Sequence, residues 1–322
     1  MIFNVNSGAG KIPVNVVPST NSSFTYDGTD KTPVWQNFDP EQLTIGGVTS
    51  AIDAGTYTVY FTPKADYEWL DGTSTPKEVT WSIAKAEGSL SLSATSGTIA
   101  GKNKTTTFTV TRAGDGAISV QSSNTGVATV SISGSTVTVT SKAYGSATIT
   151  VSVAEGANHK APSSKTYALT VSYLYLYNSG NECTSVTGGW MAYATSLPDT
   201  TPKTPNVTKG SNYLKLTNST NEPYARGGAA VTTNKISFNG FSALKFTGTA
   251  TGEGNARCMI RVWTQLNSNI DTYKVADYYF PSGGISNQTV SLNVSSLNGS
   301  YHVGIYAYTS NHTITMNKMW LE

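Results

Sequence analysis

Residues 126–153 constrain the fold most strongly, because apolar residues alternate there with threonine and serine at a period of two. Val137 and Val139 would lie on one side of a strand, while the threonines beside them lie on the other. Gly134 and Gly145 stand where the chain must turn back. Several such segments in so short a stretch predict antiparallel strands with one buried face each, which is typical of a β-sandwich.

Charged residues make up 12% of the 322 residues, well below the usual quarter. Threonine, serine, asparagine, glycine and tyrosine replace them, and this composition favours exposed strands over helices. Since a small sandwich needs about 100 residues, we predict an all-β chain of three consecutive β-sandwich domains, two Ig-like and one jelly-roll-like. The predicted parts are an N-terminal arm (1–10) and domains at 11–85, 86–173 and 174–322, with hinges near residues 85–88 and 171–175.

The predicted second domain contains the runs V-A-T-V, G-x-x-V-T-V and G-x-A-T-I-T-V. In this it resembles the bacterial Ig-like group 2 domain, over roughly residues 87–172. The resemblance implies an Ig-like spacer of the kind found on bacterial surface proteins and phage virion proteins. It implies no catalytic residue, because the family has none.

The predicted first domain carries the order Y-D-G-T, A-G-T-Y-T-V, W-x-D-G-T and V-x-W-x-I. This order resembles the YDG-type repeat, also called the MBG domain, of bacterial adhesins and phage tail proteins. Asp27–Gly28 and Asp71–Gly72 are turn dipeptides. The mucin binding ascribed to some relatives is not carried over, since the matching residues are those expected for core and turns.

The predicted third domain has longer loops, rich in glycine, asparagine and serine. Its ending, S-L-N-V-S-S-L-N-G-S-Y-H-V-G-I-Y-A-Y followed by I-T-M-N-K-M-W-L, resembles the closing strands of carbohydrate-binding-module jelly rolls. Strands are predicted at residues 173–177, 213–217, 243–247, 257–264, 289–294, 301–308 and 313–321.

Sequence motifs for catalysis or metal binding are missing. The three histidines lack metal-ligand spacing, and the chain has no nucleophile elbow and no phosphate loop. A glycosidase needs two carboxylates about 5–10 Å apart. Asp271 and Asp277 are candidates, but they lie in segments predicted to be loops, where we expect solvated acids. We therefore predict no enzyme, no metal and no cofactor.

A binding surface is predicted on the outer face of two strands. Alternation along residues 257–264 and 301–308 places aromatic and basic residues opposite the apolar core positions, with Gly304 leaving room between the rings. Sugars stack on aromatic rings and form hydrogen bonds with charged groups at the rim. The predicted ligand-binding residues are Arg261, Trp263, His302, Tyr306 and Tyr308, with Arg226 from a loop.

Exposed rings would contribute little to the core, so Trp263→Ala and Tyr306→Ala are expected to weaken binding while leaving the thermal midpoint nearly unchanged. The alternative is that these rings only pair across strands or face a neighbouring domain. The two cysteines, Cys183 and Cys258, leave two alternatives as well: one disulfide bridge, or two buried thiols.

A net charge of +2 predicts no general attraction to nucleic acid or membrane, and no apolar run is long enough to span a bilayer. No signal peptide is visible at the start of the sequence. We therefore predict a bacteriophage structural protein of the tail-fibre or adhesin type, located in the virion and present as a homo-oligomer or in many copies.

The predicted partners are host-surface glycan, bound by the third domain, and other virion proteins, bound by the arm that carries Ile2, Phe3 and Val5. Three alternatives stay open. The chain would be a scaffold or capsid decoration protein without ligand binding, a secreted bacterial adhesin, or a depolymerase.

Overall fold

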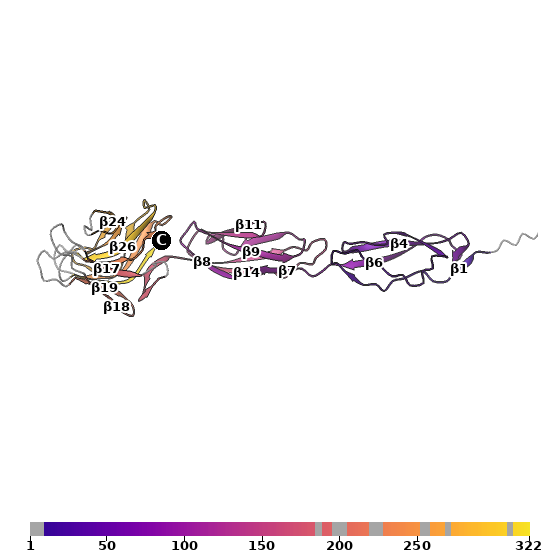
Figure 1. Ribbon diagram of the computed structural model, residues 1–322, viewed down its shortest axis with the longest axis horizontal. Coiled ribbons are helices and arrows are strands. Elements are labelled where there is room, and N and C mark those ends of the chain that lie inside the picture. The colour runs from indigo at the N-terminus through magenta and orange to yellow at the C-terminus, as the bar shows by residue number, and fades with distance from the viewer. Residues whose placement is uncertain are drawn as a thin grey trace, which may run out of the picture.

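The structure is a computed structural model that describes residues 10–183, 189–194, 205–218, 228–251, 258–267, 272–307 and 312–322. Within these residues it contains 27 strands and no helix, so none of the described elements is a helix that could cross a membrane. Three β units follow one another along an extended molecule (Figure 1). The prediction of an all-β chain of consecutive β-sandwich domains is confirmed. Residues 1–9 of the predicted arm lie outside the described residues.

The first unit packs its apolar residues against a four-stranded sheet in the order β2–β6–β4–β3, beside a parallel pair, β1–β5. Alternation along β4 buries Val59 and Phe61, and alternation along β6 buries Trp81 and Ile83. Trp69 of β5 joins this core. The strands are β1 (Ile12–Val14), β2 (Phe24–Thr25), β3 (Leu43–Gly47), β4 (Gly55–Pro63), β5 (Tyr67–Trp69) and β6 (Lys77–Ala84).

Two Asp-Gly-Thr turns of the first unit use the same contacts. Asp71 Oδ1 accepts hydrogen bonds from the Thr73 amide (3.0 Å) and hydroxyl (2.6 Å), and its Oδ2 accepts one from Lys77 Nζ (2.8 Å). Gly72 between them has a φ of 77°, in the left-handed region that favours glycine. Residues 27–31 repeat the arrangement, with Thr29 and Lys31 as the donors to Asp27.

These contacts lower the pKa of the Asp71 carboxyl to about 2, and the largest cause is the hydrogen bond from the Lys77 ammonium. A folded-state pKa below the ordinary value of 3.8 means that the carboxylate stabilises the fold above that pH. The contribution is lost as the pH falls through the folded-state pKa.

We expect Asp71→Asn to lower the urea midpoint of the first unit near pH 7, and the difference from wild type to shrink as the pH approaches about 2. Urea titrations of the full chain, followed through native amide resonances of β5 and β6, measure this. Glu78→Gln, on the exposed side of β6, is the control and should leave the urea midpoint near pH 7 nearly unchanged. A penalty for Asp71→Asn that persists unchanged at about pH 2 would contradict the role of the ionised carboxylate.

The second unit is a sandwich of two four-stranded sheets, β10–β13–β14–β8 and β11–β12–β9–β7. Val137 and Val139 are buried, as their alternation predicts. Phe108 and Tyr167 come from opposite sheets and stack with ring centroids 4.5 Å apart, which joins the two layers. The strands are β7 (Ser89–Leu92), β8 (Ser96–Ala100), β9 (Thr105–Ala113), β10 (Ile118–Ser122), β11 (Ala128–Ser133), β12 (Thr136–Ser141), β13 (Gly145–Val153) and β14 (Lys165–Ser172).

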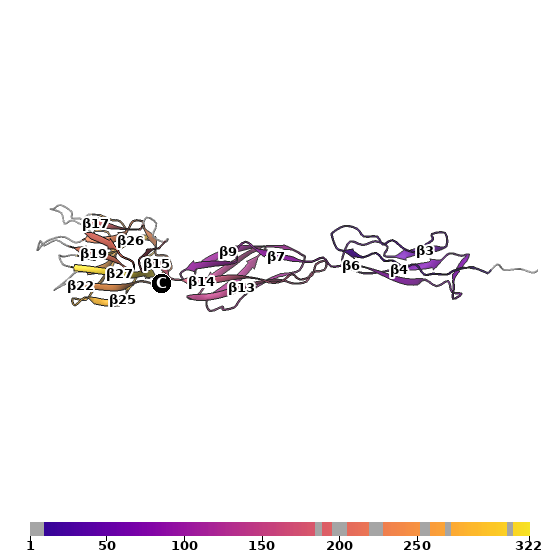
Figure 2. The ribbon, with the colours of Figure 1, turned by 90° about the horizontal axis from the view of Figure 1, so that it is seen from below.

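The third unit also has two layers, which Figure 2 shows from the side. Strand β27 is central in the seven-stranded sheet: β22 and then β25 lie on one side of it, and β15–β16 and β19–β18 share the other. The six-stranded sheet has the order β17–β20–β26–β23–β24, with β21 also paired to β26. A large apolar core lies between the two sheets.

All strands predicted from alternation in this unit are present, and six further strands were not predicted. The observed strands are β15 (Leu174–Asn178), β16 (Asn181–Glu182), β17 (Trp190–Ala194), β18 (Asn206–Lys209), β19 (Leu214–Asn218), β20 (Gly228–Thr232), β21 (Ile236–Ser237), β22 (Ala243–Thr251), β23 (Cys258–Trp263), β24 (Lys274–Tyr279), β25 (Ile285–Asn293), β26 (Ser300–Ala307) and β27 (His312–Leu321).

Candidate functional site

The candidate site is the face of the six-stranded sheet that points away from the main core. Along β23, Cys258, Ile260 and Val262 belong to the core between the sheets, whereas Met259 and Trp263 belong to a separate apolar cluster. Tyr306 of β26 joins that second cluster. We call this second side the outer face. The alternation therefore predicted correctly which side chains share it.

The outer face is buried at its centre, and the expectation that Arg261, Trp263 and Tyr306 are exposed is wrong. The exposed fraction is 1% for Trp263, 2% for Arg261 and 2% for Tyr306. Small and apolar neighbours, Ala229 and Val231, pack beside them. A period of two shows which side a residue occupies but not whether that side is covered, and strands between two layers are apolar on both faces. Further members at the edge of the cluster are Met191, Tyr193 and Leu266.

A buried ion pair crosses this face between β23 and β24. Arg261 and Asp277 are cross-strand partners. Arg261 Nε lies 2.5 Å from Asp277 Oδ1, and Arg261 Nη2 lies 2.8 Å from Asp277 Oδ2. The guanidinium centre is 5.6 Å from the centroid of the Tyr306 ring. A two-pronged contact of this kind is the geometry that best compensates a buried guanidinium. The pair fixes both side chains in one orientation.

Asp277 was predicted to lie in a loop, and this is wrong: it lies on strand β24. Its carboxylate forms ion pairs with Arg261 and, at 3.6 Å, with Lys274 Nζ. Asp271, the other acid considered for a glycosidase pair, lies outside the described residues.

Gly304 provides the space for the Trp263 ring. A Cβ on Gly304 would stand 2.9 Å from Trp263 Cζ3 and 2.7 Å from the Ala230 carbonyl oxygen, so a larger residue would force the ring or the sheet to move. His302 pairs with Trp263 across the strands, and its Nδ1 lies 3.0 Å from the Thr232 carbonyl oxygen. That contact places the proton on Nδ1.

The open part of the outer face lies along β24, the edge strand. Tyr279 is 51% exposed and Val275 is 40% exposed, and the Tyr279 hydroxyl donates a hydrogen bond to Asp277 Oδ2 at 3.3 Å. Sequence reasoning missed Tyr279 because β24 was not predicted. The signal was present, since Tyr278 and Phe280 pack toward the core and alternate with Asp277 and Tyr279.

Two predicted ligand residues, Tyr308 and Arg226, lie outside the described residues and stay predictions. Among the residues that the structure describes, no cluster of histidine, cysteine, aspartate and glutamate could hold a metal ion. Neither Cys183 nor Cys258 forms a disulfide within the described part of the chain. Burial raises the pKa of the Cys258 thiol to about 12.

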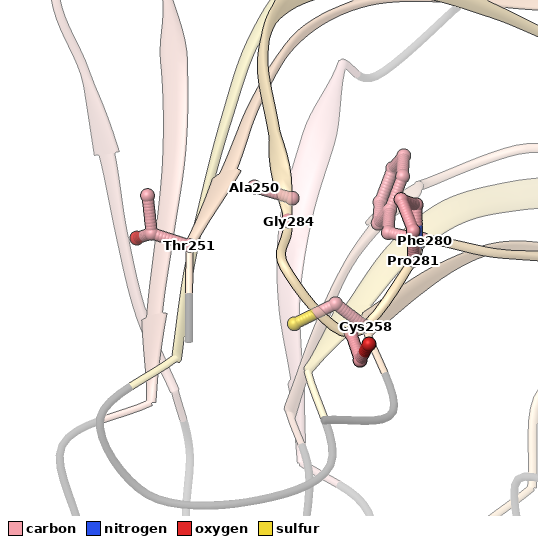
Figure 3. Close-up of a pocket in the computed structure, with 7 residues that line it drawn as sticks. Ala250, Thr251, Cys258, Phe280, Pro281 and Gly284 are labelled. Carbon is pink, nitrogen blue, oxygen red and sulfur yellow. The ribbon is translucent and has the colours of Figure 1, made fainter. Parts of the chain in front are cut away.

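Beside Cys258 lies a cavity of about 10 Å³ (Figure 3). Cys258 and Phe280 line it from one side, and Ala250 and Thr251 line it from the other. A space of this volume holds about one water molecule, so the cavity is too small for a sugar. It does not compete with the outer face as a glycan site.

No family model and no curated protein match the chain. Solved structures similar to it include a carbohydrate-binding module of the β-sandwich superfamily, at 14% identity and a TM-score of 0.28, covering 74% of this chain and 98% of the other. The secreted serine protease VesC from Vibrio cholerae shows 9% identity and a TM-score of 0.25, covering 84% of this chain and 47% of VesC.

A third similar structure is SGBP-B of a Bacteroides ovatus mixed-linkage glucan utilization locus, in complex with a mixed-linkage heptasaccharide. It shows 11% identity and a TM-score of 0.14, with 92% of this chain and 95% of the other covered. At these TM-scores the likenesses carry no argument about function. The family resemblances of residues 11–85 and 86–173 stay predictions.

Burial reverses the expected effect of removing the tryptophan ring. We expect Trp263→Ala to lower the free energy of unfolding of the third unit by about 3–5 kcal/mol, because a large buried side chain is lost. Tyr279→Ala should change it by less than about 1 kcal/mol, because that ring is half exposed. Native-state hydrogen exchange of β23 and β26 amides in the full chain measures both. A Trp263→Ala variant as stable as wild type would contradict the buried position of the ring.

Proposed function

We propose that the chain is a non-enzymatic adhesion protein whose third unit binds a glycan on its outer face. The observation that carries this proposal is the half-exposed Tyr279 ring beside the Arg261–Asp277 pair, at the open edge of the aromatic sheet face. Rings offer flat surfaces for the C–H faces of sugars, and few fixed polar groups orient them. An outer sheet face with Trp263, Tyr306 and Tyr193 is unusual in a sandwich, where outward positions are normally polar.

Within this proposal the residues take different parts. Tyr279 is the exposed ring on which a sugar stacks, and Asp277 beside it accepts hydrogen bonds from sugar hydroxyls. Arg261 positions Asp277, and Trp263 and Tyr306 form the buried floor behind them. His302, Tyr308 and Arg226 remain proposed contacts at the rim.

The first two units act as spacers in this proposal. They follow one another in line with the third unit (Figure 1), so they would hold the binding face away from the point of attachment. Many copies on one particle would convert weak single contacts into firm adhesion. We propose a bacteriophage virion as that particle, with residues 1–10 docking on another virion protein. The support is the resemblance of residues 11–85 and 86–173 to domains of phage proteins.

A glycan array probed with the full chain tests the proposal, with Tyr279→Ala as the variant. We expect wild type to bind and the variant to lose about tenfold in affinity, or about 1.4 kcal/mol, the cost of one stacking ring. Tyr60→Ala is the matched control, because Tyr60 is a partly exposed strand tyrosine of the first unit. It should bind as wild type does.

Three outcomes would contradict the proposal. Equal binding by wild type and Tyr279→Ala would show that the glycan does not bind on the outer face. Binding to no glycan at all would favour a scaffold or decoration protein. Steady release of new reducing ends from a bound polysaccharide would show a depolymerase.

A further inference from the structure

A buried serine of the second unit, Ser141, holds the loop that contacts the third unit. Ser141 is fully buried; its Oγ donates to the Gly101 carbonyl oxygen (2.9 Å) and accepts from the Lys104 amide (3.0 Å). Its own amide donates to the Lys104 carbonyl oxygen at 2.9 Å. Because both ends of the loop 101–104 are tied to Ser141, this loop presents a fixed surface.

That surface contacts the third unit. The ring of Phe241, which belongs to the core of the third unit, lies so close to Gly101 that a Cβ there would stand 2.9 Å from it. Lys104 Nζ donates to the Asn239 carbonyl oxygen at 2.5 Å and lies 5.6 Å from the centroid of the Phe241 ring. A core residue of the third unit, Phe241, therefore takes part in the contact between the two units.

Aromatic rings also lie in this joint. Tyr144 of the second unit lies 4.2 Å from Tyr173 of the linker, centroid to centroid, and Tyr173 lies 6.0 Å from Trp320 of β27. The end of the chain lies on the side of the third unit that faces the second (Figure 1). Separating the two units would expose these rings to water, which is unfavourable in proportion to the apolar area.

The joint between the first and second units is mostly polar by contrast, and a ring contact between Tyr26 and His159, with centroids 5.3 Å apart, lies beside its polar contacts. Asn158 is its centre: its Oδ1 accepts from the Ala54 amide (2.8 Å), its Nδ2 donates to Asp53 (2.9 Å), and its carbonyl oxygen accepts from the Ala86 amide (2.9 Å). An ion pair between Lys85 and Glu155 lies beside it. Water can replace each of these polar contacts, and exposed ion pairs contribute little to the free energy that holds two units together.

From this difference we infer that the second and third units move together as one rigid body, which we call the rigid head. The molecule bends at residues 85–88. The hydrogen bonds of Asn158 hold the first unit in line with the second, and we call Asn158 the latch for this reason. This differs from the expectation of hinges near both 85–88 and 171–175. The inference does not depend on what the third unit binds.

Double electron–electron resonance on the full chain tests it, with nitroxides on exposed strand positions and both native cysteines replaced. Labels at Thr80→Cys and Ser119→Cys span the first joint, and labels at Ser119→Cys and Ser291→Cys span the second. We expect the distance distribution across the first joint to be clearly broader than that across the second. Equal widths would overturn the rigid head.

Asn158→Ala tests the latch itself. It should broaden the distribution across the first joint by about twofold and leave the second unchanged. Asn124→Ala is the matched control, because the Asn124 side chain accepts hydrogen bonds from the Gly126 and Val127 amides within a loop of the same unit. An unchanged first-joint distribution in Asn158→Ala would overturn the latch.

Discussion

All three units depend on one constraint, the burial of every second side chain of a strand against a facing layer. In the second unit this places Val137, Val139 and their neighbours between two sheets, and the threonines between them face water. The third unit departs from the pattern, because β23 is buried along its whole length. Its second apolar face, with a charge pair fixed inside it, is what distinguishes the third unit from a plain sandwich.

Alternation predicted the strands and the facing of side chains well. It placed a strand at 301–308 where β26 runs Ser300–Ala307, and it put Trp263 and Tyr306 on one face. It did not predict that this face is buried, because a period of two shows which side a residue occupies but not whether that side is covered. Strand β24 was missed because Lys274 and Asp277 interrupt its apolar pattern. The charge of Asp277 is compensated by Arg261, 16 residues away, and such pairing becomes visible only once the strands are aligned.

The joints connect this face to the proposed adhesive role. If the second unit holds the third through Tyr144, Tyr173 and Phe241, the binding face keeps a defined direction relative to the sandwich that carries it. A polar joint nearer the N-terminus would then let the head search for sites on an uneven surface. Rigid presentation and one bending point together favour simultaneous engagement by several copies, because each copy can adjust without losing its orientation.

The most direct test of the central claim is the map of chemical-shift changes when a glycan that the full chain binds is titrated in. We expect the changes to concentrate on outer-face residues of β23, β24 and β26, with the Trp263 indole N–H among them. The indole signals of Trp69 and Trp81 in the first unit should stay in place. Changes centred on the seven-stranded sheet or on the first two units would contradict it.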